Sequence, residues 1–200
     1  MNNKPSKEFA FISIPKTGTQ TIHTMLGAEL KSAVNLVNGG ILDNHCPASV
    51  MREKYDDFDQ RFVFCFVRNP WHRLISWYSG HRKWNISLYM KMSFEEWVLN
   101  GCPHHWRNQQ SPTPLDQYSF IHDRDGQCLV DKIGRFENYS DDLSDILKTL
   151  NLDLTLEHIN KSKKKSSHLF TPQMDDVVNT QFKKDIELFN YEIPRELIAQ

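Results

Sequence analysis

The stretch Phe9-Ala-Phe-Ile-Ser-Ile-Pro-Lys-Thr-Gly-Thr-Gln-Thr21 decides how this chain folds. Its apolar first part predicts a β-strand over 9–14, and a helical pattern follows over roughly residues 19–30. The first N–H groups of a helix have no partner within the helix, and the helix dipole favours negative charge there. Gly18 permits close approach of the backbone to a ligand, and Lys16 adds a positive charge. The segment predicts an anion-binding loop, although an ordinary strand-to-helix turn explains it equally well on its own.

The order of lysine and glycine separates this loop from the nucleoside-triphosphate loop. That loop reads G-x-x-x-x-G-K-[ST], with its lysine directly after the second glycine. Here Lys16 precedes Gly18 instead. A kinase or GTPase interpretation therefore loses its main support.

A second buried strand is predicted over Phe62–Val67, where apolar residues run without interruption. Pro70 follows and favours the first turn of a helix, because it has no N–H group to leave unpaired. Arg68 thus follows the carboxyl end of a central strand, where open α/β sheets bind their ligands. Ser76 lies further along the same helix, and an arginine together with a hydroxyl group suits a phosphate.

Four segments together resemble the sulfotransferases that use 3′-phosphoadenosine 5′-phosphosulfate (PAPS). They are Pro15-Lys-Thr-Gly-Thr-Gln-Thr21, Val67-Arg-Asn-Pro-Trp-His-Arg-Leu-Ile-Ser-Trp-Tyr78, Asp131-Lys-Ile-Gly-Arg-Phe-Glu-Asn-Tyr-Ser-Asp-Asp-Leu143 and a closing segment from Val177 to Tyr191. The resemblance covers most of the chain and looks closest to the carbohydrate (heparan-sulfate) type branch. Gln20 departs from the family pattern, which has a small or hydroxyl residue at that place.

The resemblance implies a role for each residue that it matches. The residues that would hold the 5′-phosphosulfate of PAPS are Lys16, Thr17, Gly18, Thr19, Gln20 and Thr21. Lys16 would also be catalytic, because it meets the negative charge that accumulates on the bridging oxygen. Arg68 and Ser76 would bind the 3′-phosphate, which stays on the product, adenosine 3′,5′-bisphosphate (PAP). No metal is expected, because Lys16, Arg68 and backbone amides can meet the charges of the donor.

The resemblance assigns the catalytic base to His45, because carbohydrate-type relatives carry a histidine in a comparable place. An ordinary histidine pKa of ~6.5 suits general base catalysis. From the residues alone, His45 could instead cap the helix that begins near Pro47 or lie in a loop. The other candidate bases are His104, His105 and Glu137. The residues expected to contact the acceptor are His105, Gln109 and Glu137.

Strands and helices alternate along the chain, which predicts a mostly parallel sheet with helices on both sides. The expected fold is a single α/β domain over residues 1–200, a P-loop-like three-layer sandwich. Further expected elements are a strand near 34–37, a turn at Gly39-Gly40, helices opening at Pro47 and Ser93, a hairpin or bend around Asp125-Gly126, a helix that Ser140 caps and a long last helix from Thr171.

The chain has 24 Lys and Arg against 25 Asp and Glu, so its composition predicts neither nucleic-acid binding nor stable membrane contact. No signal peptide or long apolar stretch is present, which predicts a cytoplasmic protein unless the sequence is a trimmed piece. The four cysteines show no paired spacing, so free thiols are expected. The lysine-rich run at 161–165 is expected to form a surface loop.

These observations predict a PAPS-dependent sulfotransferase that places sulfate on a hydroxyl group, with a carbohydrate as the favoured acceptor. Two other functions stay open. One is a nucleotide kinase with an atypical loop, which would need a magnesium-binding Asp after a central strand. The other is a PAPS-binding module that has no catalytic base.

Overall fold

The structure, a computed structural model, describes residues 8–26, 34–37, 40–43, 45–83, 91–104, 115–154 and 168–199. The chain divides into two compact units. The sheet unit comprises Met1–Val67 and Ser119–Lys161, and the helical unit comprises Arg68–Tyr118 and Ser162–Gln200. Each unit is described by itself. The expectation of a single domain over the whole chain stays a prediction.

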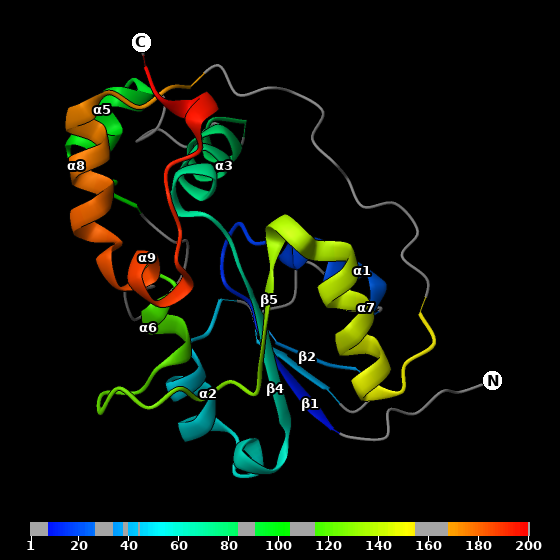
Figure 1. The fold of residues 1–200 in the computed structure, drawn as a ribbon. Helices are drawn as coiled ribbons and strands as arrows, with labels where there is room; N and C mark the ends of the chain where they lie inside the picture. The colour runs from blue at the N-terminus through cyan, green and yellow to red at the C-terminus, as the bar shows by residue number, and fades with distance from the viewer. Residues whose placement is uncertain are drawn as a thin grey trace. The chain divides into compact units, whose positions relative to one another are not determined.

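A five-stranded sheet with the strand order β2-β3-β1-β4-β5 forms the centre of the sheet unit (Figure 1). Its strands are β1 (Phe9–Ile12), β2 (Val34–Val37), β3 (Gly40–Asp43), β4 (Phe62–Val67) and β5 (Lys132–Arg135). The strands β3, β1, β4 and β5 run parallel, and β2 pairs antiparallel with β3 at one edge. The mostly parallel α/β sheet that the sequence predicts is therefore confirmed.

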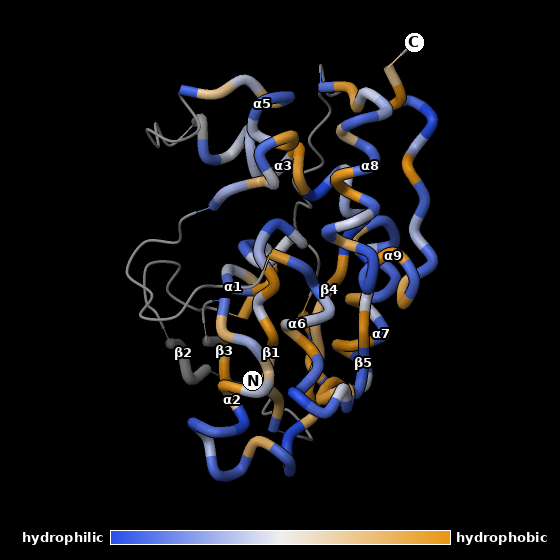
Figure 2. The backbone as a smooth tube through the Cα atoms, turned by 90° about the vertical axis from the view of Figure 1, so that its left-hand side faces the viewer, coloured by the Kyte–Doolittle hydropathy of each residue, from blue (hydrophilic) through white to orange (hydrophobic). Residues whose placement is uncertain are grey.

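Helices cover both faces of this sheet, which makes three layers. Figure 1 shows α1 (Thr19–Met25) and α7 (Tyr139–Leu150) on one side and α2 (Ala48–Lys54) on the other. The rings of Phe11 and Phe64 stack with their centroids 5.0 Å apart, in a core that α1 and α7 complete. Alternate strand residues such as Ala10 and Ile12 are also fully buried. Burial on both faces explains the continuous apolar runs of β1 and β4 (Figure 2).

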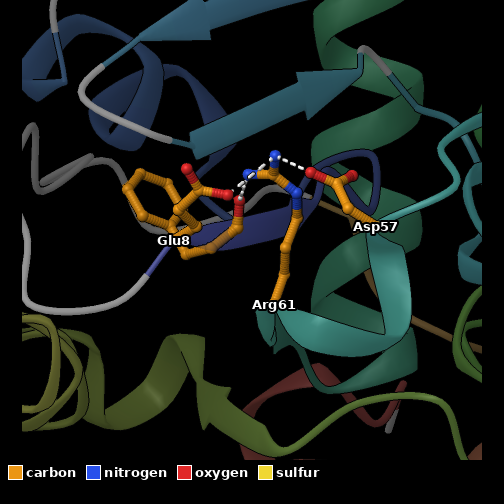
Figure 3. Close-up of polar contacts among 4 residues, drawn as sticks. Glu8, Asp57 and Arg61 are labelled. Atoms are coloured by element: carbon orange, nitrogen blue, oxygen red, sulfur yellow. Dashed lines mark hydrogen bonds and ion pairs between the residues drawn. The ribbon is translucent and has the colours of Figure 1, made fainter.

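Arg61 ties the amino ends of β1 and β4 together (Figure 3). Its guanidinium forms an ion pair with Glu8 at 3.2 Å and another with Asp57, and it donates a hydrogen bond to the Phe9 carbonyl oxygen. The hydrogen bond from Arg61 lowers the pKa of Asp57. Water screens these charges because the side chains of Asp57 and Glu8 are 43% and 61% exposed, so each pair contributes about 1 kcal/mol at most.

The helical unit contains four complete α-helices among its described residues: α3 (Pro70–Lys83), α5 (Phe94–Leu99), α8 (Pro172–Gln181) and α9 (Lys183–Phe189). The short helix α6 (Tyr118–Ile121) begins where this unit ends. The indole N–H of Trp71 in α3 donates a hydrogen bond of 2.8 Å to Asp175 in α8. Pro70 is the first residue of α3, as the sequence predicts. None of the helices that the structure describes is both long and apolar enough to span a bilayer.

Helix caps confirm some of the predicted boundaries and correct others. Ser93 and Glu96 form the predicted capping box, and Thr171 caps α8 by accepting from the Met174 N–H group. The expected cap of α7 at Ser140 is wrong, because α7 begins at Tyr139 and Asn138 precedes it as the N-cap residue. The predicted long last helix is interrupted at Phe182, which separates α8 from α9.

Of the two forms expected around Asp125-Gly126, a hairpin or a bend, the structure has a turn closed by one isolated bridge between His122 and Cys128. The expected first arm of a hairpin is the helix α6 instead. The strand β3 was not predicted, because Gly39-Gly40 indicates a turn. Gly40 instead begins the strand opposite Phe9, where a Cβ atom would come within 2.1 Å of the Phe9 ring.

Candidate functional site

The loop that carries Lys16 and Gly18 leaves the sheet at the carboxyl end of β1. The strand β1 lies between β3 and β4. After β1 the chain first forms β2 and β3 on one side of it and then β4 and β5 on the other side. Such a switch point is where open α/β sheets bind ligands. Lys16 has φ +70° and Gly18 has φ +90°, so both hold the left-handed conformation. This conformation costs a non-glycine residue about 1 kcal/mol or more, and such strain concentrates at functional sites.

Hydrogen bonds to backbone carbonyls hold this loop in shape. Thr17 is fully buried, and its hydroxyl donates to the Ile14 carbonyl oxygen at 2.9 Å. The hydroxyl of Tyr139, the first residue of α7, donates to the Gly18 carbonyl oxygen at 2.8 Å. Burial raises the pKa of Tyr139, and a hydrogen bond with the Thr21 side chain opposes that shift only in part. Tyr139 therefore keeps its proton and can donate throughout the neutral pH range.

The ring of Tyr139 also fills the space beside Gly18. A Cβ atom at Gly18 would lie 2.6 Å from Cε2 of Tyr139 and 3.2 Å from Cε2 of Phe136. Only glycine satisfies both this contact and the positive φ. Tyr139 was not among the predicted site residues, and the one signal for it was its position in the family-like stretch 131–143.

Gly18→Ala is expected to lower the free energy of unfolding by about 1–3 kcal/mol more than a matched substitution at Gly126. Gly126 has φ +82° and is exposed, so Gly126→Ala carries the same kind of backbone strain without the contact to Tyr139. Urea unfolding of both variants measures the difference. Equal losses for the two variants would mean that the Tyr139 ring yields and does not shape the loop.

His45 follows β3, the strand beside β1, and is 8% exposed. Its Nδ1 atom lies 2.6 Å from the Ser13 carbonyl oxygen. A carbonyl oxygen only accepts hydrogen bonds, so Nδ1 carries the hydrogen, and in the neutral ring Nε2 carries the lone pair. The carbonyl group of Ser13, the residue after β1, thus selects the His45 tautomer that can take a proton at Nε2.

A second buried histidine was missed from the sequence. His23 in α1 shares a hydrogen bond of 2.7 Å between its Nε2 atom and the hydroxyl oxygen of Ser13. Burial lowers the pKa of His23, which favours its neutral form. Ser13 therefore contacts both histidines, His23 through its side chain and His45 through its carbonyl. The only sequence signal was a polar residue at the end of an apolar run.

Arg68 and Ser76 lie in the helical unit, and both are half-buried. Arg68 comes directly after β4, as predicted. Its backbone is held by the side-chain amide of Gln117, which accepts from the Arg68 N–H at 2.8 Å and donates to the Arg68 carbonyl oxygen at 2.9 Å. Asn69 caps α3 by accepting from the His72 N–H group at 3.3 Å. Gln117 was not predicted, since its partner is remote in the sequence.

The remaining predicted residues belong to different units or lie outside the described part of the chain. Glu137 is exposed in a 3-10 turn of the sheet unit, directly before α7. His104 is half-buried in the helical unit, with its ring edge-to-face against Trp77 at 5.5 Å. His105 and Gln109 lie outside the described residues, and so does the lysine-rich run at 161–165. The described part of the chain contains no cluster of three His, Cys, Asp or Glu side chains able to hold a metal ion.

Comparisons with known proteins agree with the motifs in the sheet and helical units. A family model described as "Sulfotransferase family" matches residues 1–192. An uncharacterized protein of Archaeoglobus fulgidus is 31% identical over 114 residues, which are 56% of this chain and 87% of that protein. No solved structure matches the chain. Because the family model extends over residues 1–192, the chain belongs to the sulfotransferase family.

Proposed function

We propose that the protein transfers a sulfuryl group from PAPS to a hydroxyl group of a carbohydrate acceptor. Membership of the sulfotransferase family supports the transfer chemistry. The observation that carries the proposal is the loop after β1, where Lys16 and Gly18 are both left-handed and Tyr139 leaves no room for a Cβ atom at Gly18. A backbone of this kind lets N–H groups approach an anion closely, so these residues fit a phosphosulfate group.

In this proposal the loop binds the 5′ end of the donor mainly through its backbone. PAPS supplies a sulfuryl group on a bridging oxygen that becomes negatively charged as the group leaves. The N–H groups of residues 17–21 bind the 5′-phosphate. The ammonium group of Lys16 stabilises the charge on the bridging oxygen. Thr17 contributes through its N–H group, because its hydroxyl already donates to the Ile14 carbonyl oxygen.

His45 is proposed as the general base. The acceptor oxygen forms a bond to sulfur while the bridging sulfur–oxygen bond breaks, and the acceptor proton moves to Nε2 of His45. The hydrogen bond from Nδ1 to the Ser13 carbonyl oxygen supports this role, since a positively charged ring donates it more strongly. His45 thereby gains stabilisation at the moment when it becomes charged.

The 3′-phosphate is assigned to Arg68 and Ser76. A guanidinium group can bind a phosphate with two parallel hydrogen bonds, and a hydroxyl group adds a third donor. Carbohydrate as the acceptor is supported by the resemblance over most of the chain, which looks closest to the carbohydrate-type branch. The proposed acceptor contacts are His105, Gln109 and Glu137.

Calorimetric titration with PAP, AMP and ATP tests the donor site before an acceptor is known. The protein is expected to bind PAP more tightly than AMP or ATP. Arg68→Ala is expected to weaken PAP binding about 10–100-fold and to leave AMP binding unchanged, because AMP has no 3′-phosphate. Arg195→Ala, which removes an exposed arginine from the same unit, serves as the control.

A preference for ATP would overturn the proposed donor and favour the kinase interpretation. Equal losses of PAP and AMP binding in Arg68→Ala would remove Arg68 from the 3′-phosphate contacts. With the donor established, radiolabelled PAPS and a panel of carbohydrate and non-carbohydrate hydroxyl compounds identify the acceptor. Transfer to non-carbohydrate hydroxyls alone would contradict the acceptor class.

A further inference from the structure

We infer that Gln117 and Asp185 are positioning residues that set the backbone of Arg68 for recognition of a 3′-phosphate. The inference rests on the proposed function, which assigns that phosphate to Arg68. All three residues belong to the helical unit. Gln117 and Asp185 are fully buried, whereas Arg68 is half-buried. The buried pair therefore acts on a ligand only through Arg68.

The side chain of Gln117 holds Arg68 at two points. Its carbonyl oxygen accepts from the Arg68 N–H group at 2.8 Å, and its NH₂ group donates to the Arg68 carbonyl oxygen at 2.9 Å. The last strand residue before Arg68 is Val67, which still pairs with Arg135 of β5. Gln117 thus gives the Arg68 backbone a pair of hydrogen bonds of the kind that a neighbouring strand makes. The direction in which the Arg68 side chain leaves the backbone is fixed as a result.

Asp185 in turn fixes Gln117. Its carboxylate accepts from the backbone N–H groups of Gln117 and Tyr118 at 2.8 Å and 2.7 Å. It also accepts from the Gln117 side-chain NH₂ group at 3.2 Å. This last bond decides which end of the Gln117 amide faces which group of Arg68, because only the NH₂ end can face a carboxylate. The amide cannot turn over without losing bonds to both Arg68 and Asp185.

The surrounding charges distinguish Arg68 from its neighbour Arg73. Arg73 is 1% exposed, donates to the Leu115 carbonyl oxygen at 2.5 Å and lies over the Trp77 ring. Burial lowers the pKa of Arg73 to about 10, and the charge of Asp185 opposes that shift. Arg73 therefore balances the buried carboxylate in the interior. As a whole residue, Arg68 is more exposed than Arg73, half-buried rather than fully buried.

A buried charge network of this kind adds little stability compared with well-packed apolar side chains. What it does provide is a single orientation for each polar group, since every misplaced donor or acceptor would be buried without a partner. A purely structural role predicts that loss of the network weakens folding and all ligand binding together. A positioning role predicts a selective loss of 3′-phosphate recognition.

Gln117→Met is the first variant, because methionine has a similar shape and makes neither hydrogen bond to Arg68. The ratio of the AMP and PAP dissociation constants is expected to fall about 10-fold, the value of one charge-assisted hydrogen bond, while AMP binding stays the same. Gln181→Met is the matched control, since the exposed Gln181 also donates to a backbone carbonyl of this unit, that of Gly101. It is expected to leave the ratio unchanged.

Asp185→Asn is the second variant and changes few atoms. Its amide oxygen can still accept from backbone N–H groups, but its NH₂ group would face the NH₂ group of Gln117. The same selective loss is expected. A ratio of two dissociation constants does not depend on the fraction of folded protein, so partial unfolding does not hide the result. An unchanged ratio in either variant that folds overturns the inference.

Hydrogen exchange of the Arg68 amide in the unaltered protein needs no variant at all. Its rate is expected to fall on addition of PAP and to change little on addition of AMP, whereas equal responses overturn the inference. The proposed function fails separately. If the unaltered protein does not prefer PAP to AMP, both are overturned. If it does, and Arg68→Ala abolishes the preference while Gln117→Met keeps it, only the positioning role is overturned.

Discussion

Lys16→Ala is expected to lower kcat by about 10²–10³-fold while it weakens PAP binding less than ~10-fold. The reason is that negative charge develops on the bridging oxygen during the reaction. The bridging oxygen gains its negative charge only as the sulfuryl group leaves, so an ammonium group next to it stabilises the transition state more than the ground state. Single-turnover transfer from radiolabelled PAPS gives the rate, and calorimetry with PAP gives the affinity.

Lys148→Ala is the control for this experiment. Lys148 is an exposed lysine of α7 in the same unit, paired only at the surface with Asp145. Neither rate nor affinity should change in this control. If Lys16→Ala reduces the rate and the affinity by the same factor, Lys16 is a binding residue and the charge on the leaving oxygen is met by another group.

His45→Asn is expected to lower kcat by about 10²–10⁴-fold with unchanged PAP affinity. Asparagine is the preferred replacement for two structural reasons. His45 has φ +60°, which asparagine tolerates better than alanine does. The asparagine NH₂ group can also replace the donor to the Ser13 carbonyl oxygen, so the backbone contact has a substitute while the base is lost.

The pH dependence of kcat separates a base from a structural residue. A base must be unprotonated to act, so the rate of the unaltered protein should fall as the pH is lowered. This acidic limb should disappear in His45→Asn. His122→Asn, at a half-buried histidine of the same unit, should retain both the limb and the rate. If His45→Asn keeps full activity, the proton goes elsewhere, and His104, His105 and Glu137 are the next candidates.

Local sequence patterns predicted much of the sheet unit. The strands Val34–Val37 and Phe62–Val67 have the bounds that the sequence predicts. The turn from β1 into α1 follows from one glycine and a lysine next to a helical pattern. The strand β3 could not be predicted in this way, because a glycine pair indicates a turn, whereas Gly40 lies opposite Phe9, whose ring occupies the space that a Cβ atom would need. No local sequence pattern indicates that the residue opposite Phe9 must lack a Cβ atom.

The residues that hold the candidate site residues in place could not be predicted either, because their partners are remote in the sequence. Gln117 meets Arg68 across 49 residues and Asp185 across 68 residues. Ser13 contacts His45 across 32 residues. No local sequence motif indicates any of these contacts. The break at Phe182 was missed because its apolar side chain continues the helical pattern on both sides.

The bond from Tyr139 to the Gly18 carbonyl joins residues that are 121 positions apart in the chain. During synthesis, the loop that carries Lys16 and Gly18 therefore leaves the ribosome long before Tyr139, whose hydroxyl group binds the loop, has been added to the chain. Contacts between such remote residues also form late in folding, because a long segment must first be closed into a loop. Nascent chains that end before α7 are thus expected to lack a finished loop, and the proposed donor binding is expected only after the sheet unit has folded.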